Sequence, residues 1–133
     1  MDPEIVTDKE CKKCNNSMEA KLSKTLTRMP NILIVQLRRF SWDGRWQKKI
    51  HTPVKTPLYL NMGQYTNEDK AEYQLYSVIN HEGGMTAGHY KAVCREAMNG
   101  NWVCFDDRDS DTWTEAEVES NRHVQICHTS VPI

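Results

Sequence analysis

The chain of 133 residues is 38% hydrophobic and 26% charged, and its formal net charge at pH 7 is −1. This length and apolar content predict a single domain over residues 1–133 with one hydrophobic core. The near-neutral charge argues against nucleic-acid binding, which needs a basic surface.

The N-terminus and the hydropathy pattern argue against export. The first four residues, Met-Asp-Pro-Glu, are too acidic for a signal peptide. No apolar run approaches the ~18 residues of a membrane span. We therefore expect a protein of the cytoplasm or nucleus that binds no membrane. The first ten residues are polar and acidic, which predicts a loose end.

Cysteine usage points to thiols or metal ligands. Five cysteines, an odd number in a chain without a signal peptide, argue against a disulfide framework. Cys11 and Cys14 are separated by two residues, which is the spacing of half a tetrahedral zinc site. No second Cys-x-x-Cys occurs in the chain. We therefore predict a zinc half-site, which would need His51, His81 or another chain to complete it.

Residues 15–37 contain two candidate elements. Between 15 and 28, the apolar positions fit both a helix and one face of a strand. The nearly continuous apolar run Ile32–Leu37 is rich in β-branched residues, which predicts a central strand buried on both faces. Arg38 and Arg39 follow it, and we expect them to reach carboxylates or solvent.

Turn signals and prolines divide the middle of the chain. The stretch Ser41–Trp46 predicts a turn between two large aromatics. Two prolines confine the next strand to a short piece, Leu58–Leu60. The alternating segment Tyr73–Asn80 predicts a strand. It leads into a loop over 81–88 that contains three glycines and in which His81 is expected to be an ordinary loop residue.

The C-terminal region predicts a loop, a helix and a strand. Residues 108–111 are polar and predict a loop. Thr114–Glu117 has the form of a capping box, so we expect a short helix that ends near Ser120. Alternation over His123–His128 predicts a final strand.

Two alternating segments, Gly88–Cys94 and Asn101–Asp107, predict a hairpin with chemistry at its open end. His89 begins one strand, and Asp106 ends the other. A carboxylate that holds one ring nitrogen fixes the tautomer and angle of an imidazole, which can then take the proton of a nucleophile. The hairpin thus predicts the base and the orienting acid of nucleophilic hydrolysis.

The register of this hairpin decides whether His89 and Asp106 can meet. A tight Asn99-Gly100 turn would offset them by four residues, roughly 13 Å along the strand. A wider loop centred near Ala97 and Met98 would place them opposite each other on one face. We predict the wider loop.

Two blocks of sequence resemble one family. Gly-His-Tyr at 88–90, with Trp-x-x-Phe-Asp-Asp at 102–107, is similar to the histidine box of the ubiquitin-specific proteases. These are papain-like cysteine proteases that cleave after the C-terminal glycine of ubiquitin. Cys-x-x-Cys at 11–14, Ala-Lys at 20–21 and the stretch from Met-Pro to Arg-Arg-Phe at 29–40 resemble a second block of that family.

The resemblance implies a fold and roles for the site residues. It implies an α+β fold, the palm half of a papain-like protease, mostly antiparallel sheet with few short helices, and it favours a strand within 15–28. It makes His89 the general base and Asp106 the orienting acid, with Asp107 able to take that place. Glycines permit close approach to the bare Gly-Gly tail of ubiquitin. The substrate-binding residues implied in this way are Gly84, Gly88 and Tyr90. The alternative for Gly83 and Gly84 is a flexible hairpin loop without a role in binding.

The resemblance also implies a nucleophile that this sequence lacks. The family's nucleophile lies in an N-terminal cysteine box, and no cysteine here has a comparable context at a helix start. We therefore expect the chain alone to be inactive and to need the missing N-terminal half as a partner, besides ubiquitin or ubiquitinated proteins. Catalysis would need no cofactor. Two alternatives are a non-catalytic ubiquitin-binding module and a nucleophilic Cys14.

Overall fold

The computed structural model describes residues 3–68 and 71–130, and its contacts divide the chain into two compact units. These units comprise Met1–Met29 with Asn61–Ala71, and Pro30–Leu60 with Glu72–Ile133. The single domain expected from the sequence stays a prediction, because a division by contacts does not decide whether two units unfold together. None of the helices in the described residues is long and apolar enough to span a membrane.

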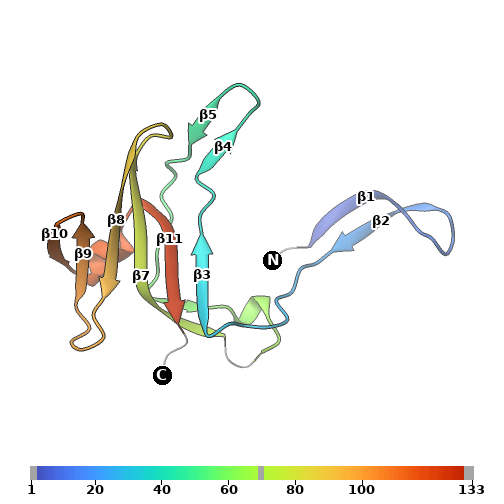
Figure 1. The fold of residues 1–133 in the computed structure, drawn as a ribbon. Helices are drawn as coiled ribbons and strands as arrows, with labels where there is room; N and C mark the ends of the chain where they lie inside the picture. The colour runs from blue at the N-terminus through green and yellow to red at the C-terminus, as the bar shows by residue number, and fades with distance from the viewer. Residues whose placement is uncertain (1–2, 69–70, 131–133) are drawn as a thin grey trace. The chain divides into compact units, whose positions relative to one another are not determined.

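The first unit contains a two-stranded hairpin (Figure 1). Strand β1 (Glu4–Glu10) pairs antiparallel with β2 (Ser17–Leu22), and a 3-10 helix, η1 (Gly63–Tyr65), also belongs to this unit. The loose end predicted for the first ten residues is wrong, whereas the strand within 15–28 is confirmed. Side chains of both strands are exposed or half-buried, so β1 carries no apolar alternation that could have revealed it.

The second unit is built on a twisted antiparallel sheet with the strand order β10-β9-β8-β7-β11-β3 (Figure 1). A further short strand, β6, also pairs with β7. The bounds are β3 Ile32–Gln36, β6 Tyr59–Asn61, β7 Glu72–Gly83, β8 Gly88–Arg95, β9 Trp102–Asp106, β10 Asp109–Trp113 and β11 Val124–Ser130. The mostly antiparallel sheet that was predicted is confirmed.

Two hairpins differ in how well the sequence predicted them. Strands β4 (Phe40–Trp42) and β5 (Gln47–Lys49) flank a turn with Gly44 at a φ of 65°, as the turn signal predicted. The polar loop predicted over 108–111 is wrong, because β10 begins at Asp109 and pairs with β9. Four of the five β10 residues are exposed, so a polar strand with little burial looks like a loop in sequence.

Strand β3 lies at an edge of the sheet, and the predicted central strand is wrong. It pairs with β11 on one side and with no strand on the other within the described residues. Ile32 and Ile34 are 54% and 60% exposed, whereas Leu33 and Val35 are half-buried. An unbroken apolar run does not reveal which face is covered, because that depends on strand order.

The core lies on one face of the sheet, where α1 (Glu115–Glu119) covers it. Its buried residues are Leu75, Val78, Val93, Trp102, Cys104, Val118 and Val124. The helix begins as predicted, because Thr114 accepts a hydrogen bond from the backbone of Glu117 and the Glu117 side chain bonds back to Thr114. Val118 from this helix is fully buried, which anchors α1 on the sheet.

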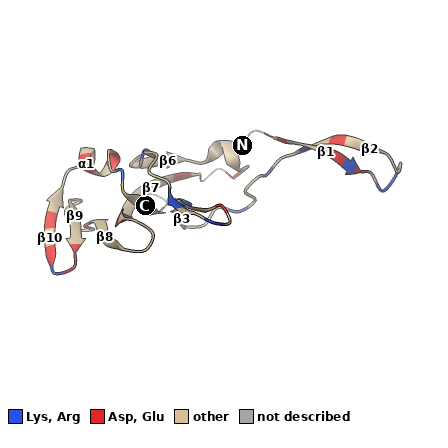
Figure 2. Cartoon of the chain, turned by 90° about the horizontal axis from the view of Figure 1, so that it is seen from above, with Lys and Arg blue, Asp and Glu red and all other residues tan. Residues whose placement is uncertain are grey.

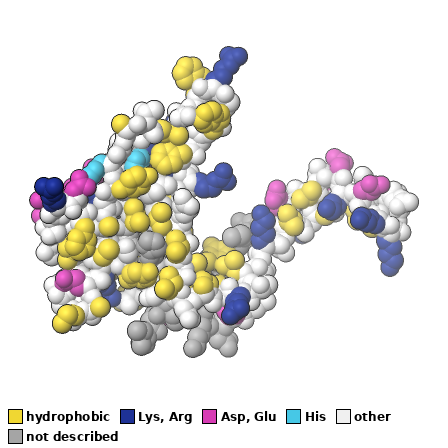
Figure 3. Space-filling view, in the orientation of Figure 1, with side chains coloured by type: hydrophobic (Ala, Val, Ile, Leu, Met, Phe, Trp, Pro, Cys, Tyr) yellow, Lys and Arg dark blue, Asp and Glu magenta, His cyan; other side chains and the backbone are white. Residues whose placement is uncertain are grey.

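Apolar side chains also lie exposed over the sheet and the β4–β5 hairpin (Figure 3). The exposed large residues of this unit include Ile32, Ile34, Trp42, Trp46, Tyr90 and Phe105. On β9, Phe105 alternates with the buried Cys104, so it faces away from the core. The face of the sheet opposite the core is therefore exposed at β9, whereas on β7 the neighbours Asn80 and His81 are both buried, so both faces are covered there.

Candidate functional site

The β8–β9 hairpin has the wide loop that was predicted. Its register pairs Ala92 with Phe105 and Arg95 with Trp102, which leaves residues 96–101 as the loop. The centre lies between Met98 and Asn99, one residue beyond the predicted centre. If this register is continued by one pair, Asp106 lies opposite Lys91, which is two residues after His89. The carboxylate therefore reaches His89 diagonally on the same face of the sheet. The predicted placement of the two residues directly opposite each other is wrong, because the loop centre is shifted by one residue.

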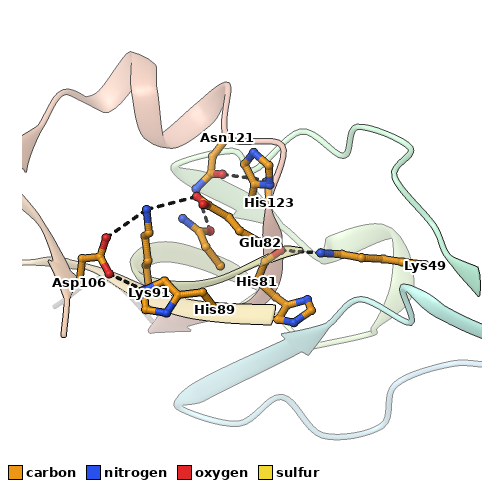
Figure 4. A network of polar contacts seen from close by, with 9 residues as sticks. Lys49, His81, Glu82, His89, Lys91, Asp106, Asn121 and His123 are labelled. Carbon is orange, nitrogen blue, oxygen red and sulfur yellow. Dashed lines mark hydrogen bonds and ion pairs between the residues drawn. The ribbon is translucent and has the colours of Figure 1, made fainter. Parts of the chain in front are cut away.

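His89 and Asp106 form a hydrogen-bonded ion pair across these strands (Figure 4). Nε2 of His89 contacts Oδ1 of Asp106, and the side chains are 44% and 36% exposed. The hydrogen bond is the main cause that raises the pKa of His89 and lowers the pKa of Asp106. Because Nε2 is engaged by the carboxylate, Nδ1 is the ring nitrogen left to exchange a proton with another group.

Lys91 and Glu82 extend this pair, and the sequence analysis missed both. Nζ of Lys91 lies 3.1 Å from Oδ2 of Asp106 and 3.5 Å from Oε1 of Glu82 (Figure 4). The period-2 rule could have found Lys91, because it lies two residues after His89 and hence on the same face of β8.

Asp107 lies beside the pair at the turn between β9 and β10. It is exposed and has a φ of 53°, in the left-handed region. A ring nitrogen of His89 and one carboxylate oxygen from each of Asp106 and Asp107 lie within 4.8 Å of one another. The negative charge of Asp107 helps to raise the pKa of His89, after the larger effects of Asp106. More acidic residues follow on β10 (Figure 2), but the acids that raise the pKa of His89 are Asp106 and Asp107.

Gly88 is a glycine because His81 occupies the space beside it. A Cβ added at Gly88 would lie 2.0 Å from Nε2 of His81 and 2.8 Å from the carbonyl oxygen of Glu82. A Cβ at Gly84 would come no closer than 3.9 Å to the carbonyl oxygen of Ala87. The need for glycine at Gly88 therefore has an explanation within the chain, besides any approach of substrate.

His81 is a buried residue of β7, so its prediction as an ordinary loop residue is wrong. It is 4% exposed, and its ring packs against Tyr90 and Phe40, with ring centroids 4.6 and 5.5 Å away. Burial lowers its pKa, with a further contribution from the charge of Lys49. Tyr90 itself is 57% exposed and faces solvent beside the 84–87 loop.

A buried lysine holds the backbone that leads to this loop. Nζ of Lys49 donates to the carbonyl oxygens of His81 at 2.7 Å and Gly83 at 2.8 Å (Figure 4). Lys49 is 8% exposed, and burial is the main cause that lowers its pKa. No sequence signal pointed to this residue, because the contact joins positions more than thirty residues apart.

Cys11 and Cys14 fit half of a zinc site and not a complete one. A tight turn brings them together, in which the amide of Asn15 donates to the carbonyl of Cys11 at 2.8 Å. Hydrogen bonds from the backbone of Lys13 and from Cys14 lower the pKa of Cys11, which favours the thiolate that zinc needs. Among the described residues, no third His, Cys, Asp or Glu joins them as a ligand.

The three cysteines of the second unit are poor candidates for a nucleophile. Burial raises the pKa of Cys104, and it raises the pKa of Cys127 to about 11. Sγ of Cys94 lies 3.4 Å from Oγ of Ser77, away from the pair. No cysteine joins the cluster of His89 with its two acids in the part of the chain that the structure describes.

The family follows from a comparison of the whole sequence. The sequence model described as ubiquitin carboxyl-terminal hydrolase matches residues 4–128, which is most of the chain. The chain belongs to this family. The predicted resemblance to the ubiquitin-specific proteases is thereby confirmed, and the hairpin with His89 and Asp106 lies inside the matched region.

Curated relatives agree with this membership. Ubiquitin carboxyl-terminal hydrolase 4 of Pongo abelii is 35% identical over 112 residues, which cover 81% of this chain and 12% of that protein. Ubiquitin carboxyl-terminal hydrolase 19 of Homo sapiens is 37% identical over 132 residues. The match covers 87% of this chain and 10% of that protein. The chain therefore spans about a tenth of the length of these relatives.

Solved structures of the family share the fold. A SAGA DUB module that contains Ubp8 matches with a TM-score of 0.86 and 25% identity, over 98% of this chain and 31% of that chain. A second such module, bound to monoubiquitin, matches with a TM-score of 0.81 and 24% identity. This match covers 98% of this chain and 30% of that chain. With the antiparallel sheet and the single short α-helix of the described residues, these matches confirm the predicted papain-like α+β fold.

Proposed function

We propose that this chain supplies the general base and its orienting acid to a cysteine-type deubiquitinase. The reaction would be hydrolysis of the peptide or isopeptide bond after the C-terminal glycine of ubiquitin. The observation that supports it is the bond between Nε2 of His89 and Oδ1 of Asp106, in a chain of the ubiquitin carboxyl-terminal hydrolase family. Localisation in the cytoplasm or nucleus belongs to the same proposal.

The geometry of the pair defines the role of each residue. Asp106 holds the imidazole through Nε2, so Nδ1 takes the proton of a cysteine thiol as the thiol attacks the carbonyl carbon. The same nitrogen returns the proton to the departing amine, which leaves a thioester. Water then attacks the thioester carbonyl while Nδ1 accepts its proton, and the C–S bond breaks. This step releases the C-terminal carboxyl group of ubiquitin, and Nδ1 returns the proton to the cysteine sulfur. The thiol would come from a segment outside the described residues.

The loop between β7 and β8 is proposed to receive the tail of ubiquitin. Residues 84–87 are exposed, and the amide of Gly84 closes the loop on the carbonyl of Ala87 at 2.9 Å. A Cβ at Gly84 would meet only the carbonyl oxygen of Ala87, at 3.9 Å, so the position is uncrowded and suits a close approach of extended backbone. Tyr90 and Gly88 border the loop on β8 and complete the proposed surface.

A transplanted segment tests the proposed function. Residues 4–128 would replace the matching segment of an active catalytic domain of the family, and release of a fluorophore from the ubiquitin C-terminus would be measured. We expect activity that falls by about 10²–10⁴ in kcat/KM with His89→Ala, the usual contribution of a general base. His51→Ala, a change at an exposed histidine, is the matched control. Equal activity of wild type and His89→Ala would overturn the proposal.

A non-catalytic ubiquitin-binding module is the second candidate, favoured by the lack of a cysteine in the site cluster of the described residues. Two measurements on the chain alone separate the candidates. The intact mass after incubation with ubiquitin that carries a thiol-trapping electrophile should show no adduct in either case. A dissociation constant for ubiquitin in the micromolar range supports the module. An adduct would identify a working nucleophile, with Cys14 the first to test.

We also propose that Cys11 and Cys14 supply two of the four ligands of a zinc ion. The remaining two would come from outside the described residues, so the chain alone should bind zinc weakly. Zinc titration of the chain and of Cys14→Ser, followed by thiolate absorbance of a cobalt-substituted sample, tests this. A tight tetrahedral cobalt spectrum from the chain alone would contradict the half-site.

A further inference from the structure

Three charged side chains connect three neighbouring strands beside the proposed base. Glu82 lies on β7, Lys91 on β8 and Asp106 on β9. Nζ of Lys91 lies 3.5 Å from Oε1 of Glu82 and 3.1 Å from Oδ2 of Asp106 (Figure 4). The Lys91 side chain is 24% exposed, so it runs over the sheet instead of extending into solvent. A lysine side chain held between two acids loses rotamer entropy. Its fixed position therefore needs a physical explanation.

The contacts use both oxygens of the orienting carboxylate. Oδ1 of Asp106 bonds to His89, and Oδ2 contacts Lys91. A carboxylate with one partner can rotate about its terminal torsion, which is broad and roughly two-fold. Two different partners, one on each oxygen, select one orientation. Lys91 therefore fixes the plane of the group that fixes the imidazole.

The charges that face His89 come from both strands beside it. Asp106 and Asp107 lie on the β9 side and raise the pKa of His89, whereas Lys91, on its own strand, lowers it. Glu82 is paired with His89 across β7 and β8, and its carboxylate points to Lys91. The ammonium group is thus the positive charge that offsets the acids around the imidazole in the described residues.

We propose that Lys91 is a positioning residue of the His89–Asp106 pair, which it orients through Asp106 and whose basicity it moderates. This inference rests on the proposed function for its catalytic meaning. Without Lys91, the carboxylate loses its second partner and the imidazolium loses a repelling charge. His89 would then be protonated over a wider pH range and would be available as a base over a narrower one.

Titration of His89 in the chain itself tests the electrostatic part. The Cε1–H chemical shift of His89 would be followed by NMR in wild type, Lys91→Met and Lys91→Arg. We expect the midpoint to move to higher pH in Lys91→Met and to stay near the wild-type value in Lys91→Arg. Methyl resonances of the buried Val78 and Val93 check that each variant is folded. An unchanged or lower midpoint in Lys91→Met would overturn the inference.

Activity in the transplanted domain tests the positioning part. Lys91→Met should lower kcat/KM near neutral pH by about tenfold, the lower end of the roughly 10–100-fold losses typical of residues that orient a functional histidine through another group. The loss should shrink as the pH rises above the His89 midpoint, and Lys91→Arg should restore most of the activity. A loss of kcat/KM that does not depend on pH, or a Lys91→Arg variant that restores no activity, would contradict the positioning role of Lys91. If the midpoint moves but His89→Ala leaves activity intact, the proposed function fails and the coupling of Lys91 to the pair stands.

Discussion

At the scale of single residues, the pair of His89 and Asp106 links protonation to folding. The folded chain favours the charged forms of both groups, since the pKa of His89 is raised above its ordinary value of 6.5 and that of Asp106 is lowered below 3.8. The contribution of the histidine is full below about pH 6.5 and is lost as the pH rises through its folded pKa. The contribution of the aspartate is full above about pH 3.8 and is lost as the pH falls through its lower folded pKa.

This linkage predicts a pH window for the stability of the pair. His89→Gln should lower the free energy of unfolding most between about pH 4 and pH 6.5, and less at higher pH. Urea unfolding of both proteins across pH 3–9 measures the difference. The double variant His89→Gln with Asp106→Asn is the control, since the coupling between the two groups is then absent. A difference that is the same at every pH would contradict the linkage.

Arg39 is a second residue whose role is set by its contacts. It is 4% exposed and was expected to reach carboxylates or solvent, but it donates instead to three backbone carbonyls. Nε donates to Val124 at 2.6 Å, and Nη1 donates to Ile50 at 3.1 Å and Thr52 at 2.8 Å. This guanidinium ties the segment after β5 to the start of β11.

Arg39→Ala should therefore lower the stability of the second unit. The change leaves the carbonyl of the buried Val124 and the part-buried carbonyls of Ile50 and Thr52 without their charged donor, and we expect a loss of about 2–3 kcal/mol in the free energy of unfolding. Arg38→Ala, at the exposed neighbouring position, is the matched control and should change it by less than about 0.5 kcal/mol. Chemical denaturation of the three proteins gives both values. Similar losses in both variants would contradict the structural role of Arg39.

At the scale of elements, the β7–β8 hairpin carries a packing constraint next to the base. Gly88→Ala places a methyl group 2.0 Å from the ring of the buried His81, with backbone on the other side, so the ring must move. We expect a loss of about 1–3 kcal/mol in the free energy of unfolding, the usual cost of overpacking. Gly84→Ala is the control, because its nearest atom is 3.9 Å away.

The same two variants separate packing from substrate approach. Thermal unfolding measures the stability of each, and a stable Gly88→Ala protein would show that His81 can move at little cost. If Gly84→Ala keeps its stability but loses affinity for ubiquitin, the open loop contributes to binding and not to folding.

At the scale of the whole molecule, the two units differ in burial. The β1–β2 hairpin of the first unit contains no buried residue, whereas β7 of the second contains six. Few buried apolar contacts give low local stability. Amide protons of β1 and β2 should therefore exchange with solvent faster than those of β7 and β11, as measured by NMR hydrogen exchange. Equal protection in both units would instead mean that residues 1–133 unfold as one cooperative domain.

The local features of this chain could be predicted because they act within a few residues. Alternation over Gly88–Cys94 and Asn101–Asp107 placed His89 and Asp106 at one end of a hairpin, and the capping box placed the start of α1. Two motifs in order identified the family. Such signals survive in sequence because strand faces and helix caps depend on residues close together in the chain.

The contacts between distant residues were decided by tertiary structure. Hairpin alternation fixes which side chains share a face, but the width of the loop shifts the register, and this shift made Lys91 the direct neighbour of Asp106. Strand order placed β3 at an edge of the sheet, although its sequence suits a central strand. The burial of His81 against Gly88 likewise requires two strands to meet. The sequence alone determined the family and the pair of groups, and the tertiary structure determined which charge faces that pair, because long-range register and burial leave no local pattern.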